Sequence, residues 1–451
     1  MSVAMKAVLL PVQERLRGFD EVDQGFNATQ AQIESNRCLL CDDAPCSKAC
    51  PAQIDVRGFI QRIRFQDLRA GVRLLREENV FAGVCGRVCP TESLCEGACR
   101  SQALTDPIRI GSLQRFLTDW EMAVGRRPLD LPPADGKPVA VIGAGPAGLA
   151  AAALLRQHGH PVTVFEARSY AGGAMVSGIP AYKLPRAVVD YEVDLVRAMG
   201  VDIRLNTRAD ENLTPAHLLA QGYGAVLLAV GLQEPYTLGL PGEDLEGVYT
   251  ALDLLEVGNG LRPRSDVRLG KDVIVIGGGS ASINAACTAL RLGAETVNVT
   301  ALGTPAEMDA FEKDRLQGLE EGIYFSSRMR PVRILGQNGH VTGLEGVRIR
   351  WRIPGRYLPD NTEDVPGSTL IMPADAVVIA IGQRAERDLT RCIEGLDLAP
   401  NGCIIVDPET GMTSQVGLFA AGDILGGRRT VVQSIAEGKK AALAVHEYLS
   451  R

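Results

Sequence analysis

Two copies of a strand, a glycine-rich turn, a helix and a second strand constrain the fold of this chain more than any other feature. The first copy is PVAVIGAGPAGLAAAALLRQHGHPVTVFEA, beginning at Pro138, and the second is KDVIVIGGGSASINAACTALRLGAETVNVTA, beginning at Lys271. Each has the form of the phosphate-binding half of a dinucleotide-binding domain. The repeat therefore predicts an α/β fold with two Rossmann-like domains, and 451 residues are enough for both and for a further domain.

The first glycine loop has the complete fingerprint of a dinucleotide site. Gly143, Gly145 and Gly148 follow the strand VAVI directly, and Glu166 ends the next strand. The first glycine permits the tight turn, the second lets the backbone approach a pyrophosphate, and the third lets the helix pack on the strand. The pyrophosphate would lie at the helix N-terminus, and the Glu166 carboxylate is placed to accept hydrogen bonds from a ribose.

Two further segments favour FAD over NAD at this loop. The small-residue run GGAMVSGIP, residues 172–180, could admit a flat ring. Near the C-terminus AAGD ends a strand at Asp423, and Thr430–Leu443 is predicted to be a helix. The aspartate can hold a ribityl or phosphate-linked hydroxyl, and the helix start can stabilise negative charge on a reduced flavin ring.

The order of the segments predicts the arrangement of the domains. Residues 1–130 are cysteine-rich and helical, with apolar residues at helical spacing across Phe59–Asn79, and Arg126–Pro138 is a proline-containing linker. After the second glycine loop, strands return at Ala374–Gly382 and Gly417–Leu425. They are too few for a third nucleotide domain, so we expect them to complete the first sheet, with the second domain inserted in the first. The expected limits are 1–130 for the helical domain, 136–250 and 375–451 for the FAD-binding domain, and 251–374 for the NAD(P)-binding domain.

Eight of the eleven cysteines lie between Cys38 and Cys99, and their spacing predicts iron–sulfur clusters. The first half reads C-x2-C-x4-C-x3-C-P up to Pro51, and the second reads C-x3-C-P-x4-C-x3-C from Cys85. In runs of this kind that end in C-P, the last cysteine usually ligates the other cluster, so the two halves are expected to share ligands. Structural zinc is the alternative, but zinc sites rarely carry the trailing C-P, and no histidine lies nearby. The other three cysteines are scattered: Cys287, Cys392 and Cys403.

Composition and charge exclude several classes of function. The net charge is −7 with a pI near 5.5, and no basic run exists to neutralise a nucleic-acid backbone. The N-terminal stretch becomes charged too soon for a secretory signal, and the uncharged window Pro138–Leu155 has the turn residues of a nucleotide loop rather than the pattern of a membrane span. We therefore expect a cytoplasmic protein with reduced thiols and with no nucleic-acid or membrane partner.

On these motifs the chain resembles the glutamate synthase small-subunit family, and within it the electron-input (PreT-type) subunits of dihydropyrimidine dehydrogenase. The resemblance covers nearly the whole chain and is most specific in CLLCDDAPCSKACP, CGRVCPTESLCEGAC, DPIRIGSLQRF, GIPAYKLP and FAAGDIL. It implies two 4Fe–4S clusters in the N-terminal helical domain. It also implies an NAD(P)H-dependent flavoprotein oxidoreductase subunit that exchanges electrons with a partner redox subunit.

The resemblance further implies which side chains hold the cofactors. One cluster would be held by Cys38, Cys41, Cys46 and Cys99. The other would be held by Cys50, Cys89, Cys95 and the side chain of Gln114. Gln114 lies in a GSLQRF motif that is similar to the one in the dihydropyrimidine dehydrogenase subunits. Cys85 would then be a small core residue. The flavin contacts would be Gly143, Gly145, Gly148, Glu166, Gly173, Gly422 and Asp423.

The second glycine loop departs from the family pattern. Gly277 and Gly279 are present, but Ser282 takes the third position, and Asn284 stands where the family has an acid. After the next strand, Ala301–Gly303 replaces a tyrosine and two arginines that grip the 2′-phosphate of NADPH in the family. Loss of both arginines should remove most discrimination for NADPH. The site either binds NADH through the pyrophosphate and backbone, which we favour, or is degenerate.

Three functions are compatible with these features. The first is a subunit in which NAD(P)H reduces FAD and single electrons leave through the clusters, as in dihydropyrimidine dehydrogenase. The second is a glutamate synthase small subunit, whose partner is the large subunit, or a ferredoxin-coupled flavoprotein of the same build. The third is an electron-wiring subunit with a degenerate nucleotide site. No acid–base residue forms a convincing substrate site, so no catalytic side chain is assigned and substrate chemistry is expected on another chain.

Overall fold

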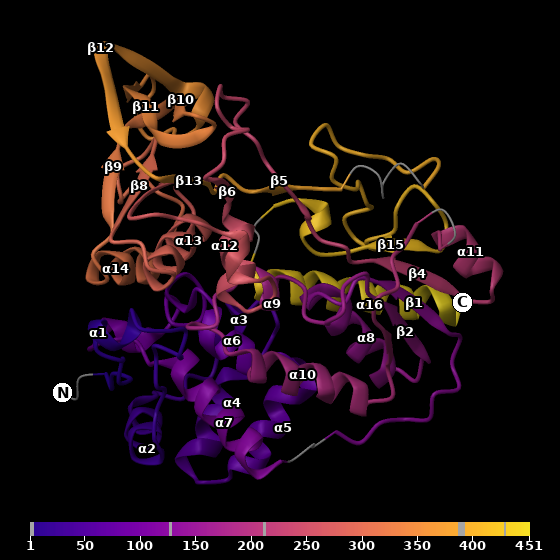
Figure 1. Cartoon of the computed structure of the whole chain (residues 1–451). Helices are drawn as coiled ribbons and strands as arrows, with labels where there is room; N and C mark the ends of the chain where they lie inside the picture. Colours follow the sequence, from indigo (N-terminus) through magenta and orange to yellow (C-terminus); the bar gives the residue numbers. More distant parts are fainter. Residues whose placement is uncertain (1–3, 126–128, 211–212, 387–392, 428–429) are drawn as a thin grey trace.

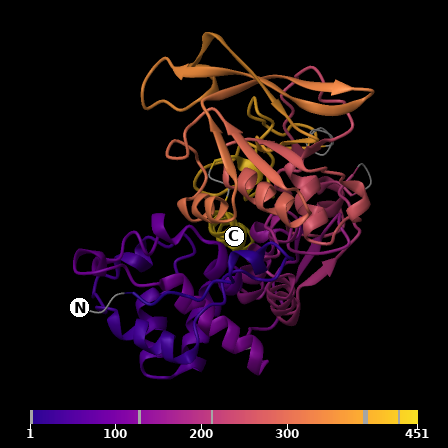
Figure 2. The same cartoon turned by 60° about the vertical axis from the view of Figure 1, so that its left-hand side comes forward.

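The chain forms a helical N-terminal domain and two α/β domains in a computed structural model that describes residues 4–125, 129–210, 213–386, 393–427 and 430–451. In Figure 1 the helical domain, coloured indigo to purple, lies below the second α/β domain and to the lower left of the first. Figure 2 shows the three domains after a turn of 60° about the vertical axis.

The helical domain is built from short helices joined by tight turns. The side chains of Asp55 and Asp67 cap two successive helices by accepting backbone N–H groups at 2.9 and 3.2 Å. The amphipathic stretch Phe59–Asn79 is therefore divided between two helices, and Gln66 between them has a φ of 59°. The helices are α1 (Val12–Arg15), α2 (Ala28–Arg37), α3 (Pro45–Lys48), α4 (Val56–Arg64), α5 (Leu68–Glu78), α6 (Ala82–Val88) and α7 (Ile110–Val124), with the 3-10 turns η1 (Thr91–Ser93) and η2 (Arg100–Ala103).

The first α/β domain has a parallel five-stranded sheet of order β15-β4-β1-β2-β3. Its strands are β1 (Val139–Ile142), β2 (Val162–Phe165), β3 (Asp202–Arg204), β4 (Ala225–Leu228) and β15 (Leu418–Ala420). Because β15 comes from near the C-terminus, two separate parts of the chain make this domain. Its helices are α8 (Pro146–Gln157), α9 (Ala174–Ser177), α10 (Arg186–Ala198), α11 (Pro215–Ala220) and α16 (Val431–Ser450), with the turn η5 (Asp423–Leu425).

The second α/β domain is inserted between β4 and β15, as predicted, and has a parallel sheet of order β6-β13-β7-β8-β9. Its strands are β6 (Val248–Thr250), β7 (Asp272–Ile276), β8 (Thr296–Ala301), β9 (Tyr324–Ser327) and β13 (Ala376–Ile379). Its helices are α12 (Ala251–Gly258), α13 (Ser280–Arg291) and α14 (Glu312–Glu320), with the turns η3 (Arg264–Asp266) and η4 (Pro359–Asn361).

The prediction for Ala374–Gly382 is wrong. This segment forms β13, which pairs with β6 and β7 in the second sheet, and only the later strand β15 completes the first. The sheet of the second domain therefore reaches beyond both predicted limits, at 250 and at 374. All four residues of β13 are buried. A fully buried apolar strand has no local feature that decides which of two parallel sheets it joins.

A three-stranded antiparallel sheet extends from the second domain. It consists of β10 (Met329–Gln337), β11 (His340–Trp351) and β12 (Thr362–Pro373), which lie at the top of Figure 1. Where the chain enters and leaves the second domain, β5 (Glu234–Pro235) pairs antiparallel with β14 (Gln383–Arg384). This short pair holds the two connecting segments together.

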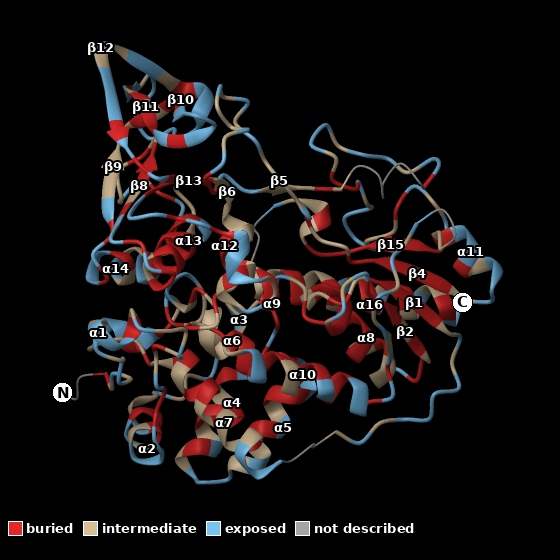
Figure 3. Ribbon diagram, viewed as in Figure 1, coloured by how far each residue is buried: buried red, intermediate tan, exposed pale blue. Residues whose placement is uncertain are grey.

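A single hydrophobic cluster runs from the helical domain into the first α/β domain. It joins Phe59 and Phe81 to Val141 of β1, and Figure 3 shows the buried residues in red along α4, α7, α8 and the first sheet. Helix α16 packs on α8, where a Cβ at Gly438 would stand 2.2 Å from the carbonyl oxygen of Ala147. The helical domain is therefore packed against the first α/β domain, where α6 contacts α10 and α16, and is not merely connected to it by the linker.

Two sequence predictions fall partly outside the described residues. In the linker, 126–128 are not described, and 129–138 form neither helix nor strand. Cys392 also lies outside the described ranges. Among the helices that the structure describes, none combines the length and the apolar character needed to cross a membrane.

Candidate functional site

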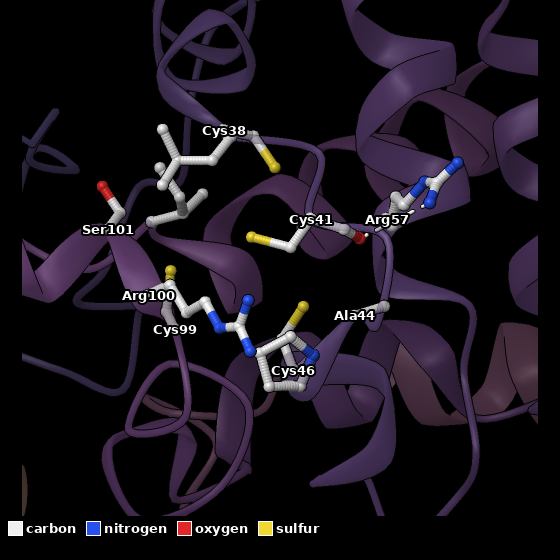
Figure 4. Close-up of a pocket in the computed structure, with 11 residues that line it drawn as sticks. Cys38, Cys41, Ala44, Cys46, Arg57, Cys99, Arg100 and Ser101 are labelled. Atoms are coloured by element: carbon white, nitrogen blue, oxygen red, sulfur yellow. Dashed lines mark hydrogen bonds between the residues drawn. The ribbon is translucent and has the colours of Figure 1, made fainter.

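Four of the clustered cysteines line one surface pocket. Cys38, Cys41, Cys46 and Cys99 come from the loop after α2, from α3 and from the residue before η2. Figure 4 shows their sulfur atoms around the same space, with Arg57 and Arg100 among the other lining side chains. Cys99 thus lies with three cysteines of the first half, in the crossed arrangement that was predicted. We call these four residues the outer set.

Three other cysteines, Cys50, Cys89 and Cys95, form a second group that we call the inner set. A hydrogen bond with Cys85 and burial raise the pKa of the Cys89 thiol well above its usual value, and the nearby Cys95 and Cys50 raise it further. Burial also raises the pKa of Cys95, and Cys50 contributes to that rise. Cys50 and Cys95 therefore lie near Cys89, and Cys46 of the outer set also acts on Cys95, so the two sets lie near each other.

Cys85 is part of helix α6, and Gln114 of α7 lies against the start of that helix. Gln114 is 7% exposed, and its Nε2 donates to the carbonyl oxygen of Ala82 at 2.6 Å, so the amide nitrogen is already engaged. Cys85 is buried in the hydrophobic cluster, and its Sγ accepts a hydrogen bond from Asn79 at 3.3 Å. Its interaction with Cys89 places it against the inner set, a contact that the expected role as a core residue did not include.

The two sets have the chemistry that 4Fe–4S clusters need. Within the described ranges, no three His, Cys, Asp or Glu side chains are grouped so that they could hold a single metal ion. A cluster differs because each iron takes one thiolate, so its ligands stand apart around a shared space. Burial raises the pKa of the Cys46 thiol to about 11. The positive charge of iron would keep such a thiol ionised at neutral pH, so the residues present fit clusters.

The backbone around the outer set is strained in a way that suits a ligand-binding loop. Leu40, Ala44 and Gln53 have φ values of 51°, 37° and 61°. Such conformations cost non-glycine residues about 1–3 kcal/mol each and persist only where surrounding contacts impose them. One such contact comes from Arg64, which donates to the carbonyl oxygen of Cys38 at 2.6 Å.

The first glycine loop makes the close contacts that its glycines were predicted to allow. A Cβ at Gly143 would stand 2.4 Å from the carbonyl oxygen of Ala229, and a Cβ at Gly148 would stand 2.1 Å from the carbonyl oxygen of Gly143. By contrast, a Cβ at Gly145 would meet no protein atom within 4 Å. Gly145 caps the N-terminus of α8, so the open space lies where a pyrophosphate fits.

Glu166 and Gly173 lie beside this loop. The buried Glu166 carboxylate accepts the backbone N–H groups of Ala144 and Arg168, both at 2.8 Å. These hydrogen bonds hold the first glycine loop in place, and the carboxylate oxygens still have lone pairs that could accept a ribose hydroxyl. A Cβ at Gly173 would stand 2.8 Å from the Cα of Gly145, so the GGAMVSGIP run passes directly against the loop.

The C-terminal AAGD segment meets the same loop. A Cβ at Gly422 would stand 2.8 Å from the Cβ of Ala147 at the start of α8. The Gly422 N–H donates to Glu437 at 3.0 Å, and Asp423 Oδ1 accepts a hydrogen bond from Ser434 at 2.9 Å. Helix α16 therefore holds the AAGD segment in place. The N-cap of this helix is Thr430, the residue at which the helix was predicted to begin.

The second glycine loop has the same tight turn but a different surrounding. A Cβ at Gly277 would stand 2.3 Å from a backbone carbonyl oxygen, whereas a Cβ at Gly279 would meet nothing within 4 Å. Ser282 is fully buried and its Oγ donates to the Gly279 carbonyl oxygen at 2.7 Å, so serine fits in the third position. Asn284 accepts a hydrogen bond from Lys183 Nζ at 2.5 Å, a contact that the sequence did not predict.

Two arginines that sequence reasoning missed contact the loop after β8. Arg328, just before β10, pairs with Glu307 at 2.6 Å, and its guanidinium carbon lies 5.4 Å from the centroid of the Trp351 ring. Arg315 of α14 donates to the carbonyl oxygen of Pro305. Only folding brings these side chains to the loop, so the residues directly after β8 give no signal of them.

Comparison with known proteins identifies both parts of the chain. Residues 137–438 match the family described as pyridine nucleotide-disulphide oxidoreductase. This chain belongs to that family. Residues 15–126 match a second family, described as dihydropyrimidine dehydrogenase domain II, 4Fe-4S cluster, so the helical domain is an iron–sulfur domain.

Three curated relatives match this chain over 90% or more of its length. The chain is 35% identical over 430 residues to the NAD-dependent dihydropyrimidine dehydrogenase subunit PreT of Escherichia coli K12, covering 95% of this chain and 97% of that one. It is 34% identical over 453 residues to the glutamate synthase (NADPH) small chain of the same strain, covering 97% and 96%. It is 37% identical over 434 residues to the NADP(+)-dependent formate dehydrogenase subunit beta of Moorella thermoacetica, but spans only 60% of that protein. The resemblance to the glutamate synthase small-subunit family is confirmed.

Solved structures support the fold of the two α/β domains. Mycobacterium tuberculosis FprA in complex with NADPH has a TM-score of 0.58 at 18% identity, covering 70% of this chain and 85% of that one. Lactococcus lactis thioredoxin reductase has a TM-score of 0.52 at 18% identity, covering 70% and 99%.

These matches establish the class of activity. The chain is an NAD(P)H-dependent flavoprotein oxidoreductase that uses FAD and 4Fe–4S clusters and acts as an electron-transfer subunit. We call the first α/β domain, where FAD is expected, the flavin domain, and the second, where the nicotinamide nucleotide is expected, the nicotinamide domain. The predicted fold class, activity class and cofactors are confirmed.

Proposed function

We propose that this chain takes electrons from NADH into FAD and delivers them through two 4Fe–4S clusters to a separate redox subunit. The position of the cysteine sets carries the proposal. The inner set adjoins the flavin domain, where Lys439 of α16 donates to the carbonyl oxygen of Ala52 at 2.9 Å, close in sequence to Cys50. The outer set lies in a surface pocket. FAD accepts two electrons at once and can release them singly, which suits an order from nucleotide to clusters.

We assign the cofactor ligands on the same basis. The outer set would hold one cluster, and the inner set with Gln114 Oε1 would hold the other. FAD would contact Gly143, Gly145, Gly148, Glu166, Gly173, Gly422 and Asp423. The pyrophosphate of the nicotinamide nucleotide would lie against Gly277 and Gly279 at the start of α13.

The surface around the outer set is the proposed binding site for the partner subunit. Leu39 lines the pocket and Leu104 follows η2, with exposed fractions of 50% and 61%. Arg57 and Arg100 also line the pocket, each in an ion pair with a nearby aspartate. Apolar residues beside charged pairs are typical of protein interfaces. The partner would carry FMN or further clusters, and would be of the dihydropyrimidine dehydrogenase or glutamate synthase large-subunit type.

The isolated chain is expected to reduce artificial dyes with NADH but to turn over no pyrimidine. Anaerobic assays of the purified chain, followed by assays with the subunit that co-purifies from native extract, test this. Uracil or thymine turnover should appear only with the partner. Leu104→Asp should weaken co-purification without changing dye reduction, and Leu443→Asp, on the exposed side of α16, is the matched control. Reduction of a metabolite by the chain alone would make the subunit proposal wrong.

NADPH should have no advantage over NADH as the reductant. The residues after β8 supply no cation for a 2′-phosphate, and Arg328 and Arg315 already have partners. Anaerobic stopped-flow bleaching of the flavin by each nucleotide measures the preference. A preference of tenfold or more for NADPH, about 1.4 kcal/mol, would show that a cation elsewhere in the fold holds the phosphate. Bleaching by neither nucleotide would favour the degenerate site, with FAD exchanging electrons through the partner.

The clusters should contain about eight irons and eight acid-labile sulfides per chain when the protein is purified anaerobically. Gln114→Ala should alter or remove one cluster and leave the other, with up to about half of the iron lost. Gln102→Ala is the control, because that amide is exposed and donates only to a backbone oxygen. Iron analysis and electron paramagnetic resonance report the result. Unchanged iron and spectra would exclude Gln114 as a ligand, and stoichiometric zinc without iron would exclude clusters altogether.

A further inference from the structure

One segment of the flavin domain runs from the first glycine loop to helix α13, which begins at the second glycine loop. It begins at Gly172, whose N–H donates to the carbonyl oxygen of Ala144 in the first loop at 2.7 Å. Its middle is held by Asn259 at the end of α12, which donates to the carbonyl oxygens of Val176 and Ile179 at 2.8 and 2.9 Å. The segment therefore follows the flavin loop closely and then crosses to the nicotinamide domain.

The far end of the segment is inserted into the nicotinamide domain. Tyr182 is fully buried within the hydrophobic cluster of that domain. The guanidinium carbon of Arg291 lies 4.0 Å from the centroid of the Tyr182 ring, and Arg291 is itself paired with the buried Glu321 at 2.5 Å. The Tyr182 hydroxyl donates to the carbonyl oxygen of Asn284 at 3.4 Å. An aromatic side chain from one domain thus forms part of the core of the other.

Lys183 adds a polar contact at the same place. Its Nζ donates to Asn284 Oδ1 at 2.5 Å and to Asp314 Oδ1 at 2.6 Å, so it joins α13 to α14. Helix α13 begins at the second glycine loop, and Asn284 lies in its second turn. The Asp314 carboxylate neutralises the positive charge of the partly buried Lys183 ammonium group, and Asn284 adds an uncharged hydrogen-bond acceptor.

We propose that Tyr182 and Lys183 are positioning residues that fix the nicotinamide domain relative to the flavin domain in the orientation needed for hydride transfer. Asn284, the residue that replaces the acid of the family pattern, then serves this contact between domains and not the nucleotide. The rate of hydride transfer depends steeply on the distance and angle between the reacting rings. The two rings are bound to different domains, so a contact that sets the orientation of the domains sets that geometry. The inference rests on the proposed transfer from NADH to FAD.

Lys183→Met in the full holoprotein tests the proposal, with Lys183→Arg as the conservative variant. Lys183→Met is expected to lower the limiting rate constant for flavin bleaching at saturating NADH by at least about tenfold. Little change is expected in the NADH concentration at half-maximal rate or in the FAD and iron contents. Dithionite should still reduce the variant fully. Amide hydrogen exchange in peptides covering 180–186 and 280–291 should become at least about threefold faster. Lys183→Arg should keep the limiting rate constant for bleaching and the amide exchange rates close to those of the wild type.

The outcomes separate this inference from the proposed function. If NADH and NADPH fail to bleach the wild-type protein, the proposed function fails, while hydrogen exchange still reports whether Lys183 joins the domains. Unchanged exchange in Lys183→Met would overturn the inference. A limiting rate within twofold of wild type, despite faster exchange, would show a structural role only and would also overturn it. If Lys183→Met does not fold, Asn284→Leu removes the same acceptor and is expected to give the same kinetic and exchange changes.

Discussion

Replacement of Gly145 by valine is expected to abolish retention of FAD while leaving the fold intact. A Cβ at this position meets no protein atom within 4 Å, so the protein itself tolerates a side chain there. The space is where the pyrophosphate would lie, at the N-terminus of α8. A valine side chain would occupy it and separate the phosphate from the backbone N–H groups. We expect a loss of at least ~100-fold in FAD affinity, about 2.8 kcal/mol.

The neighbouring glycine provides the matched control. A Cβ at Gly148 would stand 2.1 Å from the carbonyl oxygen of Gly143, so Gly148→Ala should push α8 away from β1 and destabilise the protein by about 1–3 kcal/mol. Flavin absorbance after anaerobic reconstitution measures FAD retention, and circular dichroism measures the fold and its thermal unfolding. Gly145→Val should lose flavin with a folded spectrum, whereas Gly148→Ala should lower the unfolding temperature. Stoichiometric FAD in Gly145→Val would show that the dinucleotide lies elsewhere.

The glycine loops could be predicted because their chemistry is local. A strand, a tight turn and a helix start are specified by adjacent residues, and the close contacts at Gly143 and Gly148 are the ones that the sequence pattern requires. The crossed grouping of Cys99 with the first cysteine half was also predictable, because spacing together with the family resemblance indicated shared ligands. These features depend on short stretches of chain.

The features that sequence reasoning missed depend on contacts between distant residues. Strand β13 was assigned to the wrong sheet because nothing in four buried apolar residues identifies the neighbouring strand. Arg315 and Arg328 reach the loop after β8 only through folding. In the sequence, Asn284 indicated a weakened nucleotide site. In the structure, its side chain accepts a hydrogen bond from Lys183 of the flavin domain. An unusual residue in a motif can therefore reflect a tertiary contact that one sequence does not reveal.

Loss of the Glu192 side chain is expected to destabilise the contact between the iron–sulfur and flavin domains. Glu192 lies on α10 of the flavin domain and is fully buried. Its carboxylate accepts the N–H groups of Gly83 and Val84 at 2.6 and 3.0 Å, at the start of α6. It also pairs with the buried Arg76 at 2.5 Å. One side chain therefore satisfies two backbone donors and an arginine that belong to the other domain.

Glu192→Ala should lower the free energy of unfolding by about 3–5 kcal/mol, the usual effect of removing one partner of a buried ion pair. Arg76 would keep Glu121, but the two N–H groups of α6 would lose their acceptor. Asp190→Ala on the same helix is the control: its ion pair with Arg186 is half-exposed and should contribute at most about 1 kcal/mol. Urea unfolding of the anaerobic holoprotein measures both variants. Because α6 leads directly into Cys89, Glu192→Ala should also release iron from the inner set before the outer set. Equal stability of the two variants would contradict the role of Glu192 in joining the domains.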